Sequence, residues 1–460
     1  MLEVSKNLVS GDTHALIAFG EGLSWAALDE AVKHAAKRHV LDTFGVVIAG
    51  ASGDLTQKLE GVLARVRGPG RIPIPGRKRA GDLLDAAQIA GTAGHGIELD
   101  DGYRQGSVHP GVAVVPAIAA LGYERGVDGR ALLEAAVLGY ETVIAVARAS
   151  HPDLRRRGFH PTGATGVFGA AMAAGHMLRL PNDLMSNALG LAASSAAGLF
   201  AFVNGGADVK RLHAGHAARE GLQAALLAEA GIEGPPGVIE ARDGFAQAFA
   251  FGRDGAFRSL KIPPAAPFGI TDCYVKPYAC CRHLQPAVEA LIDLMKENEI
   301  KADEVKDIQV ETYSIAAEHA HTGWQDYASA QLSFPYIMAL GLKFGWIKVA
   351  YFEDDVREST DLARYCSLVN VKGTAEMDRL YPDNRPARVT VSTDRGSFRK
   401  EAMEALGARE VPLSDDGLAL KFHDLVDPVL GVKRSGELLD RLWHLDTADD
   451  VRGLIDAMIP

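Results

Sequence analysis

The chain has 460 residues, of which 47% are hydrophobic and 23% are charged. This composition is that of an ordinary globular protein and excludes both wholesale disorder and a fibrous repeat, and the length predicts roughly two or three domains. Lys and Arg number 48 against 59 Asp and Glu, which gives a formal net charge of −11. That balance argues against a nucleic-acid partner, but small anionic substrates stay open because a local pocket can be basic within an acidic protein.

The N-terminal segment, MLEVSKNLVSGDTHAL, lacks the apolar run of a secretory signal. Nowhere does the sequence reach the roughly 18 uninterrupted apolar residues of a membrane-spanning helix, and its richest stretch, residues 111–121, is short. Four cysteines are too few for a disulfide scaffold at this length. We therefore expect a cytoplasmic protein with no membrane partner.

The first half of the chain is rich in Ala, Leu and Gly and predicts one helix after another. Ser24 is a plausible N-cap for the first long helix, and Gly50 and Gly53 offer a stop for it. Small residues allow helices to approach closely, so a tightly packed helical domain fits. The predicted helices span residues 25–49, 82–96, 111–124, 129–149, 163–178, 183–197 and 214–230.

The pattern changes near Pro263, where the run IPPAAPFGITD is typical of a linker. Beyond it, residues 305–312 alternate apolar and polar side chains as a strand does, and residues 387–400 predict two strands around a turn. Helical patterns lie between them at 283–297 and 328–344. This mixture predicts a smaller α+β domain.

The tail from Ser414 onward returns to a helical pattern and is expected to pack back on the first domain. The predicted fold class is therefore mainly α with a smaller α+β domain. The large all-helical domain is expected to be discontinuous and to comprise residues 1–265 and 410–460. The smaller domain is expected to comprise residues 266–409.

Polar residues crowd between two predicted helices in the stretch 95–109, which holds two His, three carboxylates and an Arg. Such a run is often only a solvated loop. Because this run is rich in glycine and is flanked by helices that are expected to be buried, a functional site is about as well supported as a solvated loop. His and carboxylates suit a metal, but no H-E-x-x-H or comparable spacing occurs, so no metal is expected.

Two further polar segments precede helices rich in small residues. His160 stands before the Pro-Thr-Gly start of one helix, where free N–H groups favour anions; alternatively Thr162 merely caps that helix. Lys210 follows the turn made by Gly205 and Gly206. These glycines do not form a dinucleotide fingerprint, and neither GxGxxG after a strand nor GxxxxGK[ST] is present, so NAD and nucleotide cofactors lack support.

The segment YVKPYACCRH contains Cys280 and Cys281, too few thiolates for an iron–sulfur cluster. Adjacency in sequence to His283 is poor support for a nucleophilic pair, and small buried cysteines are the favoured interpretation. His283 opens an amphipathic helix, where a basic residue can face a pocket. Ser333 and Tyr336 are candidates for binding substrate oxygen, although such a run more often starts a helix.

Together these segments resemble the MmgE/PrpD family, which includes 2-methylcitrate dehydratase, cis-aconitate decarboxylase and iminodisuccinate epimerase. They follow one another in family order along most of the chain, which makes the match specific. The resemblance implies a large helical domain, a smaller α+β lid domain, a homodimer, no cofactor and a site in the cleft between the domains. The similar segments are LDTFGVVIAGA (41–51), GHGIELDDGYRQGSVHPGVAVVPAIAAL (94–121), GYETVIAVARA (139–149), GFHPTGATGVFGAA (158–171), DVKRLHAGHAAREG (208–221), VKPYACCRHLQPAVEAL (275–291), LSFPYIMA (332–339) and VPLSDDGLALKF (411–422).

The resemblance also implies site residues, which it takes from the acidic loop and from the GFHPT, K-x-x-H-x-G and KPYACCRH segments. Members that dehydrate or decarboxylate often carry Asp-Asp-Thr in the acidic loop, where this chain has Asp-Asp-Gly-Tyr-Arg. The implied catalytic residues are His109, His160, Lys210, His283 and Asp101, and the acidic loop also supplies Glu98 and Asp100 for substrate binding. Arg104, which is the departure from the family pattern, is a further candidate for binding substrate, as are Lys276 and Arg282.

The reactions of the family pass through, or close to, a carbanion beside a carboxylate. The developing charge needs cations or donors aimed at that carboxylate, and a base and an acid must move protons, which suits His. We expect His109 and His160 to transfer protons, Lys210 and His283 to hold carboxylates, and Asp101 or Glu98 to orient a His.

The leading hypothesis is a cofactor-independent lyase acting on a small di- or tricarboxylate, most simply a hydro-lyase like 2-methylcitrate dehydratase. An epimerase like iminodisuccinate epimerase, or a decarboxylase acting on cis-aconitate, is the alternative within the family. A non-catalytic carboxylate-binding protein is a further alternative. The histidines distinguish an enzyme from a binding protein, because a binding protein needs cations but no proton-transfer pair.

Overall fold

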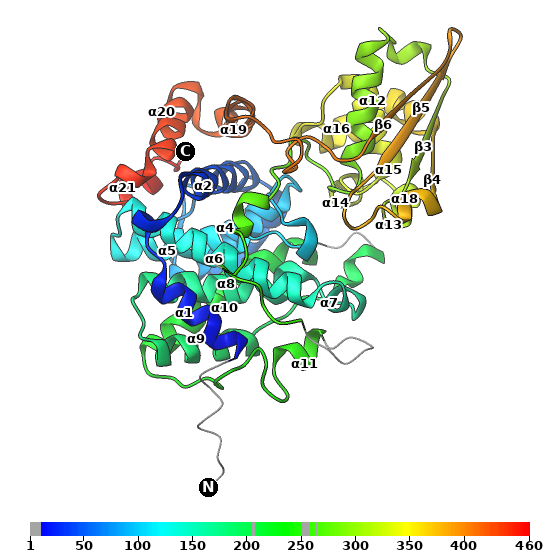
Figure 1. Ribbon diagram of the computed structural model, residues 1–460. Helices are drawn as coiled ribbons and strands as arrows, with labels where there is room; N and C mark the ends of the chain where they lie inside the picture. Colours follow the sequence, from blue (N-terminus) through cyan, green and yellow to red (C-terminus); the bar gives the residue numbers. More distant parts are fainter. Residues whose placement is uncertain (1–10, 205–207, 251–257, 264) are drawn as a thin grey trace.

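The computed structural model of the chain describes residues 11–204, 208–250, 258–263 and 265–460. Helices form a large body, and a smaller part containing a sheet stands beside it (Figure 1). Gly205 and Gly206, which the sequence singled out, lie outside the described residues. The helices of the body are α1 (Asp12–Gly22), α2 (Glu30–Gly50), α3 (Asp54–Arg67), α4 (Leu83–Gly96), α5 (Gly111–Arg125), α6 (Gly129–Ser150), α7 (Asp153–Arg156), α8 (Pro161–Met177), α9 (Asn182–Ser194), α10 (Val209–Glu229) and α11 (Phe245–Ala250).

Helix α8 lies at the centre of the body and is buried from Pro161 to Gly175. Helices α5, α6 and α10 pack directly on it, and α4 packs on α10. Small residues permit these contacts: a Cβ on Gly215 of α10 would lie 2.2 Å from the Gln88 carbonyl oxygen of α4. As a consequence, the C-terminal end of α4 and the N-terminal ends of α5, α8 and α10 come close together, and the candidate site forms there.

The tail of the chain returns to the helical body as α19 (Asp415–Leu430), α20 (Val432–Trp443) and α21 (Arg452–Asp456), with α19 packed on α2 (Figure 1). A buried ion pair joins the two helices, since Lys421 Nζ lies 2.6 Å from Asp42 Oδ1. The same ammonium group donates to the Leu99 carbonyl oxygen at 2.9 Å. The tail therefore supports the acidic loop from behind.

The smaller part, called the lid below, is built on a four-stranded sheet with the order β4-β3-β5-β6. Strands β3 and β4 run parallel and the other neighbours run antiparallel. Helix α12 packs on β5 and β6, and α15 packs on α12 and β4 (Figure 1). The lid elements are α12 (Gln285–Glu297), β3 (Asp307–Thr312), α13 (Ser314–Ala317), α14 (Tyr327–Ala330), α15 (Phe334–Phe344), α16 (Asp354–Arg357), α17 (Thr360–Cys366), β4 (Val369–Gly373), α18 (Ala375–Asp378), β5 (Ala387–Thr393) and β6 (Gly396–Ala402).

This architecture confirms the predicted fold class, mainly α with a smaller α+β domain. Local differences have clear causes. Ser24 makes no capping hydrogen bond, and a short 3-10 helix, Trp25–Ala27, precedes the start of α2 at Glu30. The helix predicted over residues 328–344 is divided into α14 and α15, and Pro335 stands in the first turn of α15. Across the described residues, no helix combines the length and the hydropathy that a membrane crossing requires.

Candidate active site

The loop between α4 and α5 carries the predicted acidic residues into the interior. Helix α4 ends at Gly96, and Glu98 then turns the chain in the left-handed region with a φ of 54°, a conformation uncommon outside glycine. Gly102 and Tyr274 exchange backbone hydrogen bonds of 3.1 and 2.8 Å. These bonds tie the loop to the segment that leads into the lid.

Asp101 fixes the end of this loop. One carboxylate oxygen accepts a hydrogen bond from the Gly111 backbone N–H at 3.1 Å, and the other accepts from the Tyr140 hydroxyl at 2.7 Å and lies 3.0 Å from His39 Nδ1. The Asp101 backbone oxygen lies 2.6 Å from His109 Nδ1. Asp101 thus anchors the loop to the start of α5 and sets the orientation of the His109 ring.

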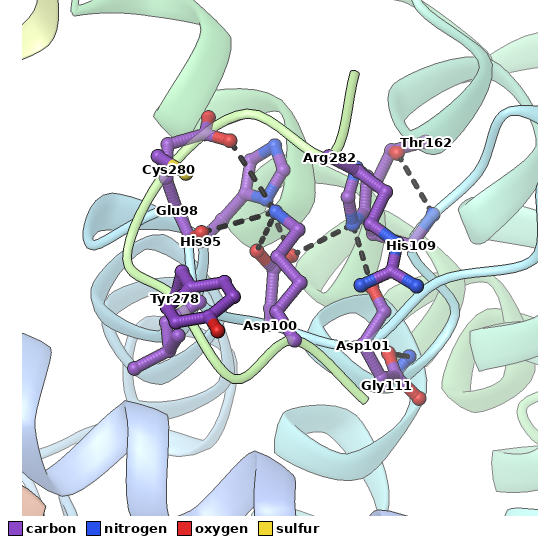
Figure 2. A network of polar contacts seen from close by, with 12 residues as sticks. His95, Glu98, Asp100, Asp101, His109, Gly111, Thr162, Tyr278, Cys280 and Arg282 are labelled. Atoms are coloured by element: carbon purple, nitrogen blue, oxygen red, sulfur yellow. Dashed lines mark hydrogen bonds and ion pairs between the residues drawn. The ribbon is translucent and has the colours of Figure 1, made fainter. Parts of the chain in front are cut away.

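Asp100 lies between two histidines (Figure 2). Its Oδ2 is 2.7 Å from His95 Nδ1 and 3.3 Å from His109 Nδ1, and the two imidazole rings are 5.1 Å apart. Burial lowers the pKa of His95 to about 3, although Asp100 opposes this change, and burial likewise lowers the pKa of His109. Burial alone would raise the pKa of Asp100, but His109, His95 and Lys276 lower it. At neutral pH the group therefore consists of a carboxylate and two neutral imidazoles.

Two lysines face the carboxylates of the loop. Lys276, which is 1% exposed, places its Nζ 3.1 Å from the Glu98 backbone oxygen, 3.4 Å from Glu98 Oε2 and 3.6 Å from Asp100 Oδ1. Lys210, in the first turn of α10, contacts the other carboxylate oxygen of Glu98. Burial and the positive charges of Lys276 and Arg211 lower the pKa of Lys210 well below its ordinary value. Lys210 therefore releases its proton more readily than an exposed lysine.

His160 adds a third imidazole to the group from the N-terminal end of α8. Its ring lies 5.7 Å from the His95 ring, and its Nδ1 is 3.1 Å from Nδ1 of His213 on α10. Burial, with the neighbouring histidines adding to it, lowers the pKa of His160 well below its ordinary value. Thr162, in the same turn, accepts a hydrogen bond from the His109 backbone N–H at 3.2 Å.

Arg104 and Arg282, which were expected to contact substrate, use their guanidinium groups to hold the lid. Arg104 contacts Glu404 and lies 2.8 Å from Glu410. Arg282 donates to two consecutive backbone carbonyl oxygens of the lid at 2.8 Å each. The structure thus gives both arginines partners on the lid segment that follows β6, whereas Lys276 lies within the polar group.

His283 lies among aromatic side chains of the lid. Its Nδ1 shares a hydrogen bond of 2.5 Å with the Tyr313 hydroxyl, and its ring is 6.3 Å from the Tyr381 ring. Burial and the positive charge of Arg385, with smaller effects of His319 and others, lower the pKa of His283 well below its ordinary value. His283 is therefore held as a neutral imidazole beside Tyr313 and Tyr381.

Two histidines of this group, His95 and His213, were absent from the site residues predicted from the sequence. Both lie in segments that the sequence had marked as polar clusters, one at the end of α4 and the other in the first turns of α10. Each of these two histidines lies close to the end of a helix and in the same segment as a predicted site residue, and that position is the sequence signal that indicates them. Helices rich in small residues bring such ends together.

Cys281 is a further residue that the sequence analysis set aside. Its backbone N–H donates to the Gln331 carbonyl oxygen at 3.0 Å, and its partly exposed thiol faces His319. Burial opposes ionisation, but the hydrogen bond and the charge of His319 lower the pKa of Cys281 to about 6, with Lys210 contributing. Burial raises the pKa of Cys280, which matches the inert buried cysteine expected there.

His95, Asp100 and His109 bring ligand atoms within 4.8 Å of one another, close enough to be tested as a metal site. Both imidazole Nδ1 atoms already face Asp100 or the Asp101 backbone oxygen. The Lys276 ammonium group also stands beside the same carboxylate. A divalent cation there would be repelled by that ammonium group, so the arrangement fits a charge-balanced polar group rather than a metal centre.

The chain therefore has a two-domain architecture, a large helical body and a smaller α+β lid, with the polar group close to the ends of the body helices. The chain belongs to the MmgE/PrpD family, as the sequence resemblance predicted: the MmgE/PrpD N-terminal domain matches residues 14–258 and the C-terminal domain matches residues 278–445. It is 27% identical over 477 residues to cis-aconitate decarboxylase of Aspergillus terreus (strain NIH 2624 / FGSC A1156), with 98% of this chain and 96% of that protein covered. It is 26% identical to a cis-aconitate decarboxylase-like protein of Aspergillus oryzae (strain ATCC 42149 / RIB 40), with 91% of each covered, and 30% identical to the human cis-aconitate decarboxylase, with 50% and 48% covered.

Proposed function

We propose that the protein is a cofactor-independent lyase that removes carbon dioxide from a small unsaturated tricarboxylate of the cis-aconitate type. The observation that carries this proposal is that His95, His109, His160 and Lys210, which stand at helix ends, meet Lys276 from the segment that leads into the lid. The fungal cis-aconitate decarboxylases that align with nearly the whole chain support this substrate class.

Decarboxylation leaves the electron pair of the broken carbon–carbon bond on a carbon that is conjugated with a retained carboxylate. Cations held beside that carboxylate stabilise the developing charge, and such stabilisation is usually the largest single contribution to the rate. In this proposal Lys210 and Lys276 hold the retained carboxylates, and His283 approaches from the lid. His109 and His160 deliver the proton that completes the reaction, and Asp101 positions His109 through its backbone oxygen.

The fungal cis-aconitate decarboxylases favour decarboxylation over the dehydration expected from the sequence. Burial lowers the pKa values of His95, His109 and His160, so these rings are neutral in the free protein and a proton has to reach them when the substrate binds. Carbon dioxide leaves as a neutral molecule and needs no acid at that step, so the proton on a ring goes only to the carbanion. Dehydration of 2-methylcitrate and epimerisation stay predictions that the same experiment tests.

The test is incubation of the purified protein in heavy water with cis-aconitate, and in parallel with 2-methylcitrate, followed by proton NMR and detection of carbon dioxide. Release of carbon dioxide with one deuterium in the product is the expected result. Loss of water would support the hydro-lyase, and exchange of a substrate proton without net product would support an epimerase. Neither turnover nor exchange with any polycarboxylate would refute an enzymatic function on this class of acid.

Two variants test the roles within the site. His160→Ala is expected to abolish turnover and to leave the fold intact, whereas Lys210→Ala is expected mainly to raise KM, more strongly for substrates of higher charge. His444→Ala is the matched control, because that side chain is 66% exposed at the end of α20. Normal kinetics in both site variants would remove the assignment.

The partner expected for this protein is the small polycarboxylate alone, with no cofactor. A homodimer stays a prediction that follows from the family resemblance. Light scattering on the purified protein measures it directly, and a monomeric mass would refute it.

A further inference from the structure

A cavity of about 680 Å³ lies between the helical body and the lid, and His95, His109 and His160 are not among the residues that line it. One wall comes from the end of α6 and from α7, a second from residues 258–261, and the third from the lid residues Ile315 and Tyr381–Asp383. Figure 1 shows α7 on the side of the body that lies beneath the lid. A cavity of this size is within the range of small-molecule sites.

The cavity is strongly basic, although the protein is acidic. Arg148, Arg156, Arg258 and Lys261 line it, against the carboxylate of Asp383. Arg148 is held in place by the Lys261 carbonyl oxygen, to which it donates a hydrogen bond. With a net charge of −11 for the chain, four cations on one cavity create a local positive field that attracts anions.

His151 lines the same cavity, and its pKa reflects the positive charges there. Burial and the positive charges of Arg385, Arg156 and Arg258 lower its pKa to about 4, so the ring is neutral at physiological pH. Its buried Nδ1 makes no hydrogen bond within the described part of the chain. A carboxylate group in the cavity would therefore be attracted by the positive field and would lie beside the neutral, polar ring of His151.

One aromatic side chain connects this cavity with His283, which the family resemblance assigns to the active site. Tyr381 lines the cavity, and its ring stacks on Tyr313 with centroids 4.7 Å apart and lies 6.3 Å from His283. Tyr313 in turn shares a hydrogen bond with His283. Tyr381 therefore borders both the cavity and the Tyr313–His283 pair.

We propose that this cavity is a second binding site for a polycarboxylate anion, where substrate is captured before it passes Tyr381 to reach the histidine group. The capture role rests on the proposed function, whereas anion binding by the cavity does not. Cations outside the reacting site raise the local concentration of an oppositely charged ligand and its rate of association. Capture therefore acts on kcat/KM and leaves kcat unchanged.

The binding test uses citrate as the probe and isothermal titration calorimetry as the measurement. The wild-type protein is expected to bind two equivalents, and Arg156→Glu/Arg258→Glu is expected to bind one. Lys276→Gln, which impairs the inner site, is expected to retain the citrate bound in the outer cavity. Arg65→Glu/Lys433→Glu, on the exposed faces of α3 and α20, controls for the same change in total charge. Titration with inorganic phosphate in place of citrate shows whether the cavity selects carboxylates or accepts any polyanion, and a phosphate affinity equal to that of citrate would contradict a polycarboxylate site.

The kinetic test separates this proposal from the proposed function. The Arg156→Glu/Arg258→Glu variant is expected to lose roughly tenfold in kcat/KM at about 0.01 M ionic strength and to match the wild type at about 1 M, where charges are screened within a few ångströms. An unchanged citrate stoichiometry in the Arg156→Glu/Arg258→Glu variant, or a kcat/KM equal to that of Arg65→Glu/Lys433→Glu, would overturn the proposal. If the protein turns over no polycarboxylate but the cavity still binds citrate, the proposed function fails and the anion site stands.

Discussion

Cys281 gives the sharpest prediction, because the structure makes this thiol different from the other three. The hydrogen bond and charge of His319 lower its pKa from 9.0 to about 6, against the effect of burial. At pH 7 a thiol with that pKa is roughly nine-tenths ionised, whereas one at 9.0 is roughly 1% ionised. We therefore expect iodoacetamide to alkylate Cys281 of the native protein with a rate that rises to half its plateau near pH 6.

The assay is peptide mass spectrometry after brief alkylation across a range of pH. Burial raises the pKa of Cys280 and Cys273 and raises that of Cys366 to about 12, so these thiols should stay unmodified until the protein is unfolded. His319→Gln keeps a polar group beside the thiol but removes the charge, so the midpoint should move upward by more than one pH unit. A wild-type midpoint near pH 9, or no movement in His319→Gln, would refute this account of the pair.

Three further predictions concern the site and its support. Asp100→Asn is expected to lower kcat by roughly a hundredfold or more, since groups that set the tautomer and charge of a catalytic imidazole have effects of that order. Steady-state kinetics measure this loss, and a loss in kcat below threefold would contradict the role of the carboxylate. Lys421→Met leaves the Asp42 carboxylate buried without its cation, so urea unfolding at pH 7 should show a loss of about 3–5 kcal/mol, with Lys421→Met/Asp42→Leu recovering most of it. Gly215→Ala places a Cβ 2.2 Å from a backbone oxygen and should lower the free energy of unfolding by at least about 2 kcal/mol. Gly61→Ala, with open space around its Cβ in the middle of α3, should raise the free energy of unfolding by about 0.5–1 kcal/mol. Equal melting temperatures for these two glycine variants would contradict the packing argument.

The body helices were predictable because their signals are local. Asp82 caps α4 by accepting from the Asp85 backbone N–H at 2.8 Å, and α5 starts at Gly111 as predicted. Strand β4 was missed for the opposite reason. It is a short edge strand, Val369–Gly373, and it pairs in parallel with β3, whose residues lie far away in the sequence. Its five residues, Val-Asn-Val-Lys-Gly, alternate apolar and polar side chains, but the run is short and none of its residues is buried, so the local signal is weak.

The same distinction separates the site residues. His109, His160 and Lys210 belong to segments that the family resemblance marked, and packing of the helices brings together the helix ends at which they stand. Lys276 belongs to another such segment, KPYACCRH, and lies outside the helices. The direction of an arginine side chain carries no such signal. Arg104 lies in the acidic loop, but its partners Glu404 and Glu410 are about three hundred residues away in the sequence, so its role in holding the lid emerges only from the tertiary structure.

The charge balance of the site has a consequence for binding. Glu98 and Asp100 face Lys210 and Lys276 in a buried space, so the lysines that meet an incoming polycarboxylate already have anionic partners. Burying additional negative charge without compensation is costly. The neutral imidazoles of His95, His109 and His160 resolve this conflict, because a bound anion raises their pKa values and draws protons onto them. The burial that keeps these rings neutral beforehand thus makes them the groups that charge when substrate arrives, and binding should take up protons from solution. Calorimetric titrations in buffers of different ionisation enthalpy measure that uptake, and binding without proton uptake would contradict this charge balance.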